Sequence, residues 1–493
     1  MPIQQILLGS GGGGEKYFIG VFGTSSYAEG DFSSPKINID SSGNIYITTM
    51  TYYGLNGVTP SGVILKYDKN GTLQWQNWFH LGAATTARAI DVDSSGNIYV
   101  AGYTTKSVQS QSGNNGFLAK YNSSGATQWV RTIGNTVGYS DYFFNLKTIS
   151  STGTTYVIGE SPARKAQNVG TGWTDMLIAK YDSSGNVSSS DIYYHGGNGS
   201  YTSGWSIAVD TVGNYYPMGY ISSGSTNGIY VEKFNTSHQA QWQRHLYQSG
   251  YYTRGQGGVA VDPSSGSPNV YVCGDTNYLS TGTRDMVIVK LNSSGGTVWQ
   301  RYLGIASRAA YGRDIDVDSS GNVYAIGYGS VDYQNYQGYT STMNTIIIVK
   351  YNSSGNLQWK RYLGVMIVPT QSGQYTDVEE GRSIKVDPTG THFYVSGITK
   401  NGNFGYGDDD GVWAKLPTDG SLTGTYSRGS GYKDIVYGDA TNLTDKAGLL
   451  TNNSYTDGYG TLSMNAADIT SFASYAYGGQ SKDTVVISWI VIT

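Results

Sequence analysis

One pattern returns seven times along this chain. A unit reads RAIDVDSSGNIYVAGYT (88–104) and then GFLAKYNSSGATQWVRTIG (116–134); it comes back as GRDIDVDSSGNVYAIGYGS (312–330) with TIIIVKYNSSGNLQWKRYLG (345–364). The second half of each unit carries the same lysine, at Lys66, Lys120, Lys180, Lys233, Lys290, Lys350 and Lys415. A repeat of 53 to 65 residues constrains the fold before any single strand is assigned.

Each unit predicts four strands. Short runs rich in β-branched and aromatic residues alternate with turn-forming clusters, of the type DSSGN (93–97) between the first and second strands and NSSG (122–125) between the third and fourth. Seven four-stranded antiparallel sheets fit the blades of a β-propeller, which protects its sheet edges by radial repetition. A right-handed parallel β-helix is the competing architecture, but its rungs are shorter and lack two hairpins per unit.

The first hairpin of the unit resembles the bacterial β-propeller repeat family (SBBP), whose motif has the form D-x-x-G-N-x-Y-V-x-G. The resemblance covers residues 37–429 and implies a propeller fold. It implies no activity, because propellers host many unrelated functions. Unit three departs from the motif, since its first turn reads Ser150-Ser151-Thr152-Gly153 without the Asp.

A large aromatic residue in the fourth strand predicts how the blades pack. Trp occupies this site at positions 75, 129, 242, 299 and 359, whereas unit three has Ser189 and unit seven has Gly424. We expect these rings to lie between neighbouring sheets. Upstream of unit one, the stretch 16–23 aligns with 358–364 and places Phe18 where Trp359 stands. We therefore predict that Lys16 to Phe22 is the outermost strand of blade seven and closes the ring.

The predicted organisation is all-β: a seven-bladed β-propeller of four-stranded antiparallel blades over residues 15–429. Residues 1–14 form an apolar octapeptide, Met1 to Leu8, on a glycine tether. We expect this octapeptide to be an attachment peptide that is ordered only when docked on another subunit. Residues 430–493 form a β-rich carboxyl-terminal extension without the repeat, and its end (484–493) has the pattern of a fully buried strand.

The two faces of such a propeller differ in their loops. The first-to-second and third-to-fourth turns share one face, which we call the short-turn face. The other, the loop-rich face, carries the second-to-third and inter-blade loops, which are rich in Tyr, Gly, Ser and Asn. Such a mixture suits recognition surfaces, although loops of a chain with 44 Tyr are also consistent with plain solvated loops. The candidate ligand-binding tyrosines are Tyr252, Tyr278, Tyr336, Tyr375 and Tyr406.

Three arginines precede the capping Asp of the first turn by five residues: Arg88, Arg313 and Arg382. Because the first strand lines the channel of a propeller, we expect these guanidinium groups near the channel mouth on the loop-rich face, where they suit carboxylate or phosphate ligands. The alternative is ordinary ion pairing with Glu379, Glu380 or Asp377.

Signals for catalysis and for metal or cofactor binding are weak. The five His residues fall at different repeat positions and form no catalytic motif, and the single Cys excludes an intrachain disulfide. Asp91 and Asp93 resemble part of a calcium loop but lack the later bidentate acid, and the turn alone explains Asp93. Asp408, Asp409 and Asp410 form a second cluster of carboxylate oxygens, which we interpret as part of a solvated loop. We predict a non-enzyme without cofactor, although carboxylate pairs across the channel leave a polysaccharide hydrolase or lyase open.

The functional hypothesis is a virion protein. The net charge of −4 argues against nucleic-acid binding, and no segment is apolar enough for membrane insertion. The opening MPIQQILLG resembles N-termini of structural proteins of tailed bacteriophages, including those that infect cyanobacteria. This resemblance implies a tail-fibre-like adhesin that recognises a host glycan or envelope protein and contacts other virion proteins through Met1 to Leu8 and the extension. The alternatives are a bacterial surface or secreted interaction scaffold and a polysaccharide-degrading enzyme.

Overall fold

The computed structural model describes most of the chain. The described residues are 3–10, 16–23, 35–52, 60–106, 113–134, 140–162, 174–187, 191–196, 201–223, 226–263, 267–278, 283–305, 307–334, 340–365, 379–387, 389–400, 409–426, 435–441, 443–447, 451–454, 458–461, 465–468, 473–476 and 487–490. None of them belongs to a helix long and apolar enough to cross a membrane.

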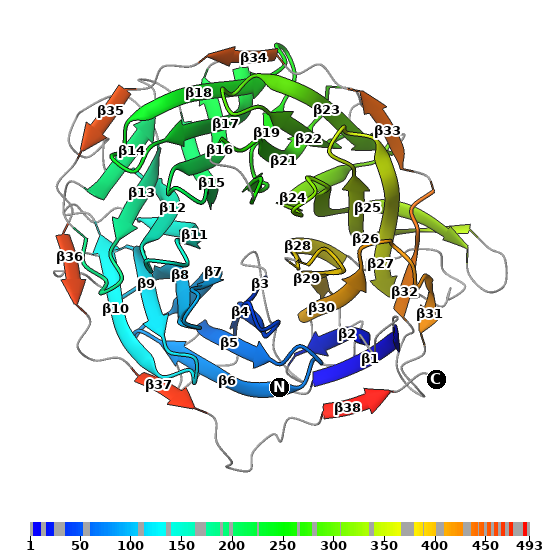
Figure 1. Ribbon diagram of the computed structural model, residues 1–493, viewed down its shortest axis with the longest axis horizontal. Coiled ribbons are helices and arrows are strands. Elements are labelled where there is room, and N and C mark those ends of the chain that lie inside the picture. The colour runs from blue at the N-terminus through cyan, green and yellow to red at the C-terminus, as the bar shows by residue number, and fades with distance from the viewer. Residues whose placement is uncertain are drawn as a thin grey trace.

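Seven antiparallel blades surround a central channel, which confirms the predicted propeller (Figure 1). Blade 1 contains β3 (Lys36–Ile39), β4 (Ile45–Thr51), β5 (Ser61–Tyr67) and β6 (Leu73–His80). Blade 2 contains β7 (Thr85–Val92), β8 (Ile98–Thr104), β9 (Asn115–Tyr121) and β10 (Thr127–Gly134). Blade 3 contains β11 (Tyr142–Thr148), β12 (Thr155–Ser161), β13 (Asp175–Tyr181) and β14 (Ile192–Gly196). Blade 4 contains β15 (Tyr201–Val209), β16 (Tyr215–Ser223), β17 (Thr226–Phe234) and β18 (Ala240–Tyr247).

The remaining blades show two variations. Blade 5 contains β19 (Thr253–Arg254), β20 (Val259–Val261), β21 (Val270–Thr276), β22 (Asp285–Leu291) and β23 (Thr297–Gly304). Blade 6 contains β24 (Ala310–Val317), β25 (Val323–Gln334), β26 (Thr340–Tyr351) and β27 (Leu357–Val365). Blade 7 contains β28 (Glu379–Val386), β29 (His392–Lys400), β30 (Asp409–Pro417) and β2 (Lys16–Phe22). The innermost strand of blade 5 is thus split in two, and both pieces pair with β21.

The amino-terminal segment closes the ring as predicted, but β2 is not the outermost strand of blade 7, because β1 (Ile3–Ser10) and β38 (Ile487–Ile490) lie outside it. β2 pairs antiparallel with β30, and Phe18 lies opposite Lys415. Trp359 lies opposite Lys350 in blade 6, so Phe18 takes the place that the tryptophan holds in other blades. The segment after the repeat does not compete for this edge, because β31 (Gly424–Tyr426) pairs instead with β32 (Ile435–Asp439) in the sheet of blade 6.

The expectation that Met1 to Leu8 is ordered only on another subunit is wrong. Residues 3–10 form β1 (Ile3–Ser10), which pairs antiparallel with β2 from Ile3 opposite Phe22 to Ser10 opposite Lys16. The physical reason is the free edge of β2: its backbone donors and acceptors provide a local template for a neighbouring β-prone segment. Residues 3–10 are therefore a fifth strand of blade 7.

The carboxyl-terminal extension forms an outer belt around the ring (Figure 1). Its strands are β32, β33 (Thr444–Ala447), β34 (Thr451–Ser454), β35 (Gly458–Thr461), β36 (Asn465–Asp468), β37 (Ala473–Ala476) and β38 (Ile487–Ile490). They pair in turn with the outer strands of blades 6, 5, 4, 3, 2 and 1 and finally with β1 of blade 7. From β33 to β37 the strands begin seven or eight residues apart. An extended segment of seven residues reaches about 23 Å, which we take as the step between blades at the rim.

The residues of the repeat motif form the same hydrogen-bond network in the first hairpins of blades 1, 2, 4 and 6. In blade 2, Asp93 Oδ1 accepts from the backbone N–H groups of Ser95 and Asn97, each at 2.9 Å. Its Oδ2 accepts from Asn97 Nδ2 at 2.8 Å and from the Tyr99 hydroxyl at 3.1 Å. Gly96 adopts φ 75°, a conformation that glycine enters without steric cost. The turn thus uses both oxygens of Asp93, as the sequence predicted.

The repeated lysine connects six of the seven blades to the next one. In all seven blades its ammonium group lies 5.0 to 5.9 Å from the ring centroid of the motif tyrosine in the same blade. In six of them, all except the blade of Lys233, the ammonium also donates to a backbone carbonyl in the third-to-fourth turn of the following blade, as Lys290 does to Ser353 at 2.9 Å. Lys415 of blade 7 donates to the Lys69 carbonyl of blade 1 at 3.2 Å. We call this arrangement the lysine clamp.

The fourth-strand tryptophans pack between blades, as predicted. Trp299 Nε1 donates to the same Ser353 carbonyl at 3.2 Å, and Trp359 Nε1 donates to the Thr418 carbonyl at 3.0 Å. A Cβ atom on Gly355 would lie 2.8 Å from the Trp299 ring, so the turn of the next blade requires glycine at this contact. The residues of the third-to-fourth turn and the tryptophan of the preceding blade therefore form the two sides of one interface between blades.

Deletion of residues 1–22 should lower the melting temperature strongly, because it removes two strands of blade 7 and uncovers β30. A chain that begins at residue 11 keeps β2, so its melting temperature should decrease less. Thermal unfolding followed by circular dichroism compares the two. An unchanged melting temperature for the shorter chain would contradict the closure of the ring by β2.

Lys290→Met should reduce the free energy of unfolding by about 2 kcal/mol, because it removes a charged donor and a cation–π contact from a buried site. Lys69→Met is the matched control, since Lys69 is exposed and joins the clamp only through its backbone carbonyl. Urea unfolding measures the free energy of unfolding of both variants. Equal stability of the two variants would show that the clamp contributes nothing.

Candidate functional site

The three predicted arginines occupy equivalent bulges on first strands. The pairing register shifts between Ala87 and Ala89, between Gly312 and Asp314, and between Gly381 and Ser383. The residues that the shifts skip are Arg88, Arg313 and Arg382. The same bulge holds Phe144 in blade 3 and Trp205 in blade 4. A bulge re-aims its side chain, so one backbone feature positions all five residues near the start of the innermost strands.

Each arginine has protein partners. Arg313 Nη1 lies 3.4 Å from Asp275 Oδ1, and its Nη2 donates to the Tyr328 hydroxyl at 3.0 Å. Arg382 pairs with Glu380, which confirms the ion pairing that the sequence allowed as an alternative. The Arg88 guanidinium lies 5.1 Å from the centroid of the Phe144 ring. Their role in ligand binding stays a prediction.

Lys36 lies beside these arginines in the half of the channel nearest the loop-rich face, which we call the upper channel; the half nearest the short-turn face is the lower channel. Burial lowers the pKa of the Lys36 ammonium, Asp314 opposes this shift, and the charges of Arg382, Arg88 and Arg313 lower the pKa further. Its Nζ donates to the Arg382 carbonyl at 3.0 Å. Four cations from blades 1, 2, 6 and 7 therefore act on one another at this level of the channel.

A second group, the tyrosine–arginine cluster, connects blades 4 and 5. The Tyr252 ring lies between two guanidinium groups, with Arg254 Cζ at 5.0 Å and Arg284 Cζ at 4.8 Å from its centroid. Its hydroxyl accepts a hydrogen bond from Tyr220 at 3.1 Å. Asp275 Oδ2 fixes Arg284 through an ion pair of 2.6 Å. The structure thus holds Tyr252 in one orientation.

Further tyrosines extend this cluster toward solvent. Tyr251, 41% exposed, meets the half-buried Tyr278 edge to face at a centroid distance of 5.0 Å. Two of the predicted tyrosines, Tyr252 and Tyr278, are therefore neighbours through Tyr251. The other three, Tyr336, Tyr375 and Tyr406, lie outside the described residues.

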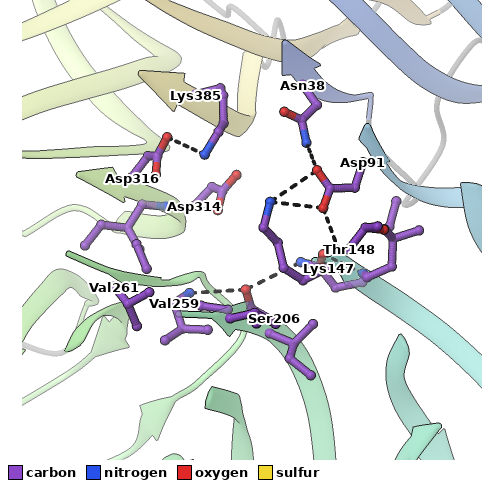
Figure 2. Close-up of a pocket in the computed structure, with 18 of the residues that line it drawn as sticks. Asn38, Asp91, Lys147, Thr148, Ser206, Val259, Val261, Asp314, Asp316 and Lys385 are labelled. Atoms are coloured by element: carbon purple, nitrogen blue, oxygen red, sulfur yellow. Dashed lines mark hydrogen bonds and ion pairs between the residues drawn. The ribbon is translucent and has the colours of Figure 1, made fainter. Parts of the chain in front are cut away.

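A cavity of about 480 Å³ occupies the lower channel, toward the short-turn face (Figure 2). The first strands of all seven blades contribute to its wall. Its lower rim includes the first-turn residues Ser150, Thr211 and Pro263, whereas Arg88, Arg313 and Arg382 are not part of its lining. The cavity and the arginines are therefore separate levels of one channel.

Two ion pairs between neighbouring blades form the polar wall of this cavity (Figure 2). Lys147 Nζ of blade 3 lies 3.0 Å from Asp91 Oδ2 of blade 2, and Lys385 Nζ of blade 7 lies 2.8 Å from Asp316 Oδ2 of blade 6. Asn38 Nδ2 of blade 1 donates to Asp91 Oδ1 at 2.5 Å. Burial opposes the charge of Lys385, but Asp316 outweighs it and raises the pKa of the ammonium.

These carboxylates also satisfy the free edges of the innermost strands. Asp91 Oδ2 accepts from the Thr148 N–H at 2.7 Å, and Asp316 Oδ2 accepts from the Val386 N–H at 2.9 Å. In blades 4 and 5 the corresponding positions, Ala208 and Ala260, carry small apolar side chains. One side of the cavity therefore carries the ion pairs, whereas the wall from blades 4 and 5 is apolar except at its rim, where Asp210 and Asp262 accept hydrogen bonds within their own first hairpins.

Sequence reasoning missed this cavity. A signal was present, because Asp91, Asp316 and Lys385 stand two residues before the first turn of their units and Lys147 stands three before its own, and each Asp is followed by a Lys in the next unit. The size and the opening of the cavity depend on seven distant strands, and no local pattern carries that information.

Comparison with known proteins supports the repeat. Residues 80–107 and 298–334 match the model of SBBP, a beta-propeller repeat. Each segment contains the first hairpin of a blade, β7 with β8 and β24 with β25. A search of curated proteins gave no significant match.

Solved structures show only distant likeness. A luciferin-regenerating enzyme is 12% identical over 67% of this chain and 91% of its own, with a TM-score of 0.34. A mannose phosphorylase from Leishmania mexicana is 12% identical over 54% and 80%, with a TM-score of 0.25. A GH32 beta-fructofuranosidase from Bombyx mori is 9% identical over 84% and 90%, with a TM-score of 0.27. At such TM-scores none of them bears on the activity of this protein.

Tyr252 should ionise at lower pH than an ordinary tyrosine. Burial raises the pKa of its phenol, but hydrogen bonds from Tyr220 and Arg254 and the charges of Arg254 and Arg284 outweigh burial and lower it. An ultraviolet absorbance titration of the native protein should show one early phenolate that is absent in Tyr252→Phe. In Arg284→Met this phenolate should appear at higher pH; an unchanged titration in both variants would contradict the cluster.

Proposed function

We propose that this protein is a recognition propeller of a tailed bacteriophage virion, a tail-fibre-like adhesin that binds the host surface through its loop-rich face. The tyrosine–arginine cluster carries the recognition part of this proposal. Tyr251 presents an exposed ring, while Tyr252, Arg254 and Arg284 are fixed behind it by packing and by the ion pair to Asp275. A preorganised site loses little conformational entropy on binding.

The chemistry of the cluster favours acidic glycans. Aromatic faces pack against the C–H faces of sugar rings, and guanidinium groups bind carboxylate or phosphate. The cations of the upper channel, Lys36, Arg88, Arg313 and Arg382, add positive charge near the same face. Many copies on one particle would turn millimolar affinity at each site into firm adsorption.

The resemblance of residues 1–9 to phage structural proteins supports the virion location. Since residues 3–10 belong to blade 7, we propose that the belt makes the contacts with other virion proteins. The belt is the outermost layer of six blades, and in blade 6 only β31 lies outside it, so a partner that approaches the rim meets the belt first at nearly every blade.

Host adsorption of multivalent displays tests the recognition face. A variant with Tyr251, Tyr252 and Tyr278 changed to serine should lose at least about tenfold in adsorption, since hot-spot aromatics dominate such interfaces. The control changes the exposed Ser95 and Ser320 on the short-turn face to lysine. Normal adsorption by the folded tyrosine variant, with loss in the control, would place recognition on the other face.

Mass spectrometry of purified particles tests the virion location. The intact protein should copurify with particles, and a chain that ends at residue 429 should not. Presence of the intact protein only in the host cell fraction would refute this part of the proposal.

A further inference from the structure

We propose that the cavity of the lower channel is a binding site for a small neutral saccharide of one or two sugar units, entered from the short-turn face. This site is separate from the loop-rich face and does not depend on the proposed adhesin function. Its volume of about 480 Å³ falls within the range of small-molecule sites.

The cavity offers unused hydrogen-bonding capacity at fixed positions. An ammonium group has three donors, and within the described part of the chain Asp316 is the only acceptor of Lys385. Asp316 accepts from Lys385 and Val386 through Oδ2, which leaves Oδ1 for a ligand. The side chains of Lys147 and Lys385 are 32% and 30% exposed, so solvent and ligands reach both.

The charge pattern selects a neutral ligand. Lys147 and Lys385 are each neutralised by an Asp from the preceding blade, and Lys36 lies near Asp314 at the upper end. The two other carboxylates of the lining, Asp210 and Asp262, lie at the rim and accept hydrogen bonds within their own first hairpins. An anion would have to displace the paired carboxylates, and a cation would have to displace the ammonium groups. A sugar hydroxyl donates and accepts at once, so it can bridge an intact Asp–Lys pair.

The opposite wall complements the other surface of a sugar ring. Ala208, Ala260, Val259 and Val261 come from blades 4 and 5 and line the cavity, where Val259 and Val261 also pack against the core between these blades. Figure 2 shows Val259 and Val261 across from the Asp91–Lys147 pair. A pyranose has hydroxyls at its edge and C–H groups on its faces. It therefore matches a site with one charged and one apolar wall.

Calorimetry and ligand-observed NMR with a panel of small ligands test this proposal. The panel contains glucose, galactose, N-acetylglucosamine and maltose as neutral saccharides, glucuronate and glucosamine as charged ones, and glycine as a zwitterion. We expect at least one neutral saccharide to bind with a dissociation constant of about 0.1–5 mM, more tightly than every charged member. No binding by any neutral saccharide, or tighter binding of a charged member, would overturn the proposal.

Two pairs of variants locate the binding. Lys385→Met should weaken the saccharide at least about tenfold by removing a charged donor, whereas the exposed Lys69→Met should not. Val261→Phe fills the cavity and should abolish binding, whereas Val212→Phe should not, because Val212 is 59% exposed and outside the lining. If Lys385→Met fails to fold, Val261→Phe and its control Val212→Phe still show whether the saccharide binds in the cavity.

The same measurements separate this site from the loop-rich face. If serine at positions 251, 252 and 278 abolishes saccharide binding while Val261→Phe preserves it, the sugar binds at the tyrosine–arginine cluster. That outcome would overturn the channel site and leave the adhesin proposal standing. Loss in Val261→Phe alone would support the channel site whatever the adsorption results.

Discussion

The lysine clamp is the contact on which the ring depends. A propeller blade has few hydrogen bonds to its neighbours, because its ladder bonds are satisfied inside the sheet, so specific contacts must fix the angle between blades. Here one ammonium group connects the motif tyrosine of its own blade to a turn carbonyl of the next. The tryptophan of the fourth strand donates to the same carbonyl. Because Lys415 reaches Lys69, this contact also crosses the closure between blades 7 and 1.

Two chain ends reinforce that closure in different ways. β2 completes blade 7 and β1 adds a fifth strand, while the belt runs back around the rim in the opposite direction and ends beside β1. Each blade therefore has at least five strands, and both ends of the chain meet at the same blade (Figure 1). Both segments that connect blade 1 to blade 7 along the chain, residues 16–39 and 473–490, end in the sheet of blade 7, where β2 pairs with β30 and β38 pairs with β1.

The channel combines two chemistries along one axis. At the loop-rich end, bulges on the first strands position arginines and aromatic rings, and loops between blades 4 and 5 build the tyrosine–arginine cluster. At the short-turn end, paired Asp and Lys residues connect neighbouring blades and surround a cavity. The ion pairs serve the fold, since their carboxylates accept backbone N–H groups of the next strand. Their remaining donors and acceptors are what a ligand can use.

The sequence by itself determined the blade count, the two hairpins of each blade, the role of the tryptophans and the closing strand at residues 16–22, because each rests on local turn chemistry repeated at a fixed period. It also placed Arg88, Arg313 and Arg382 on innermost strands. Only the tertiary structure decided the place of β1 and the belt. A strand pairs with whichever free sheet edge lies within reach, and the sequence of the strand does not specify which edge that is. The cavity likewise arises where seven strands separated by hundreds of residues converge, and its shape exists only once the ring has closed.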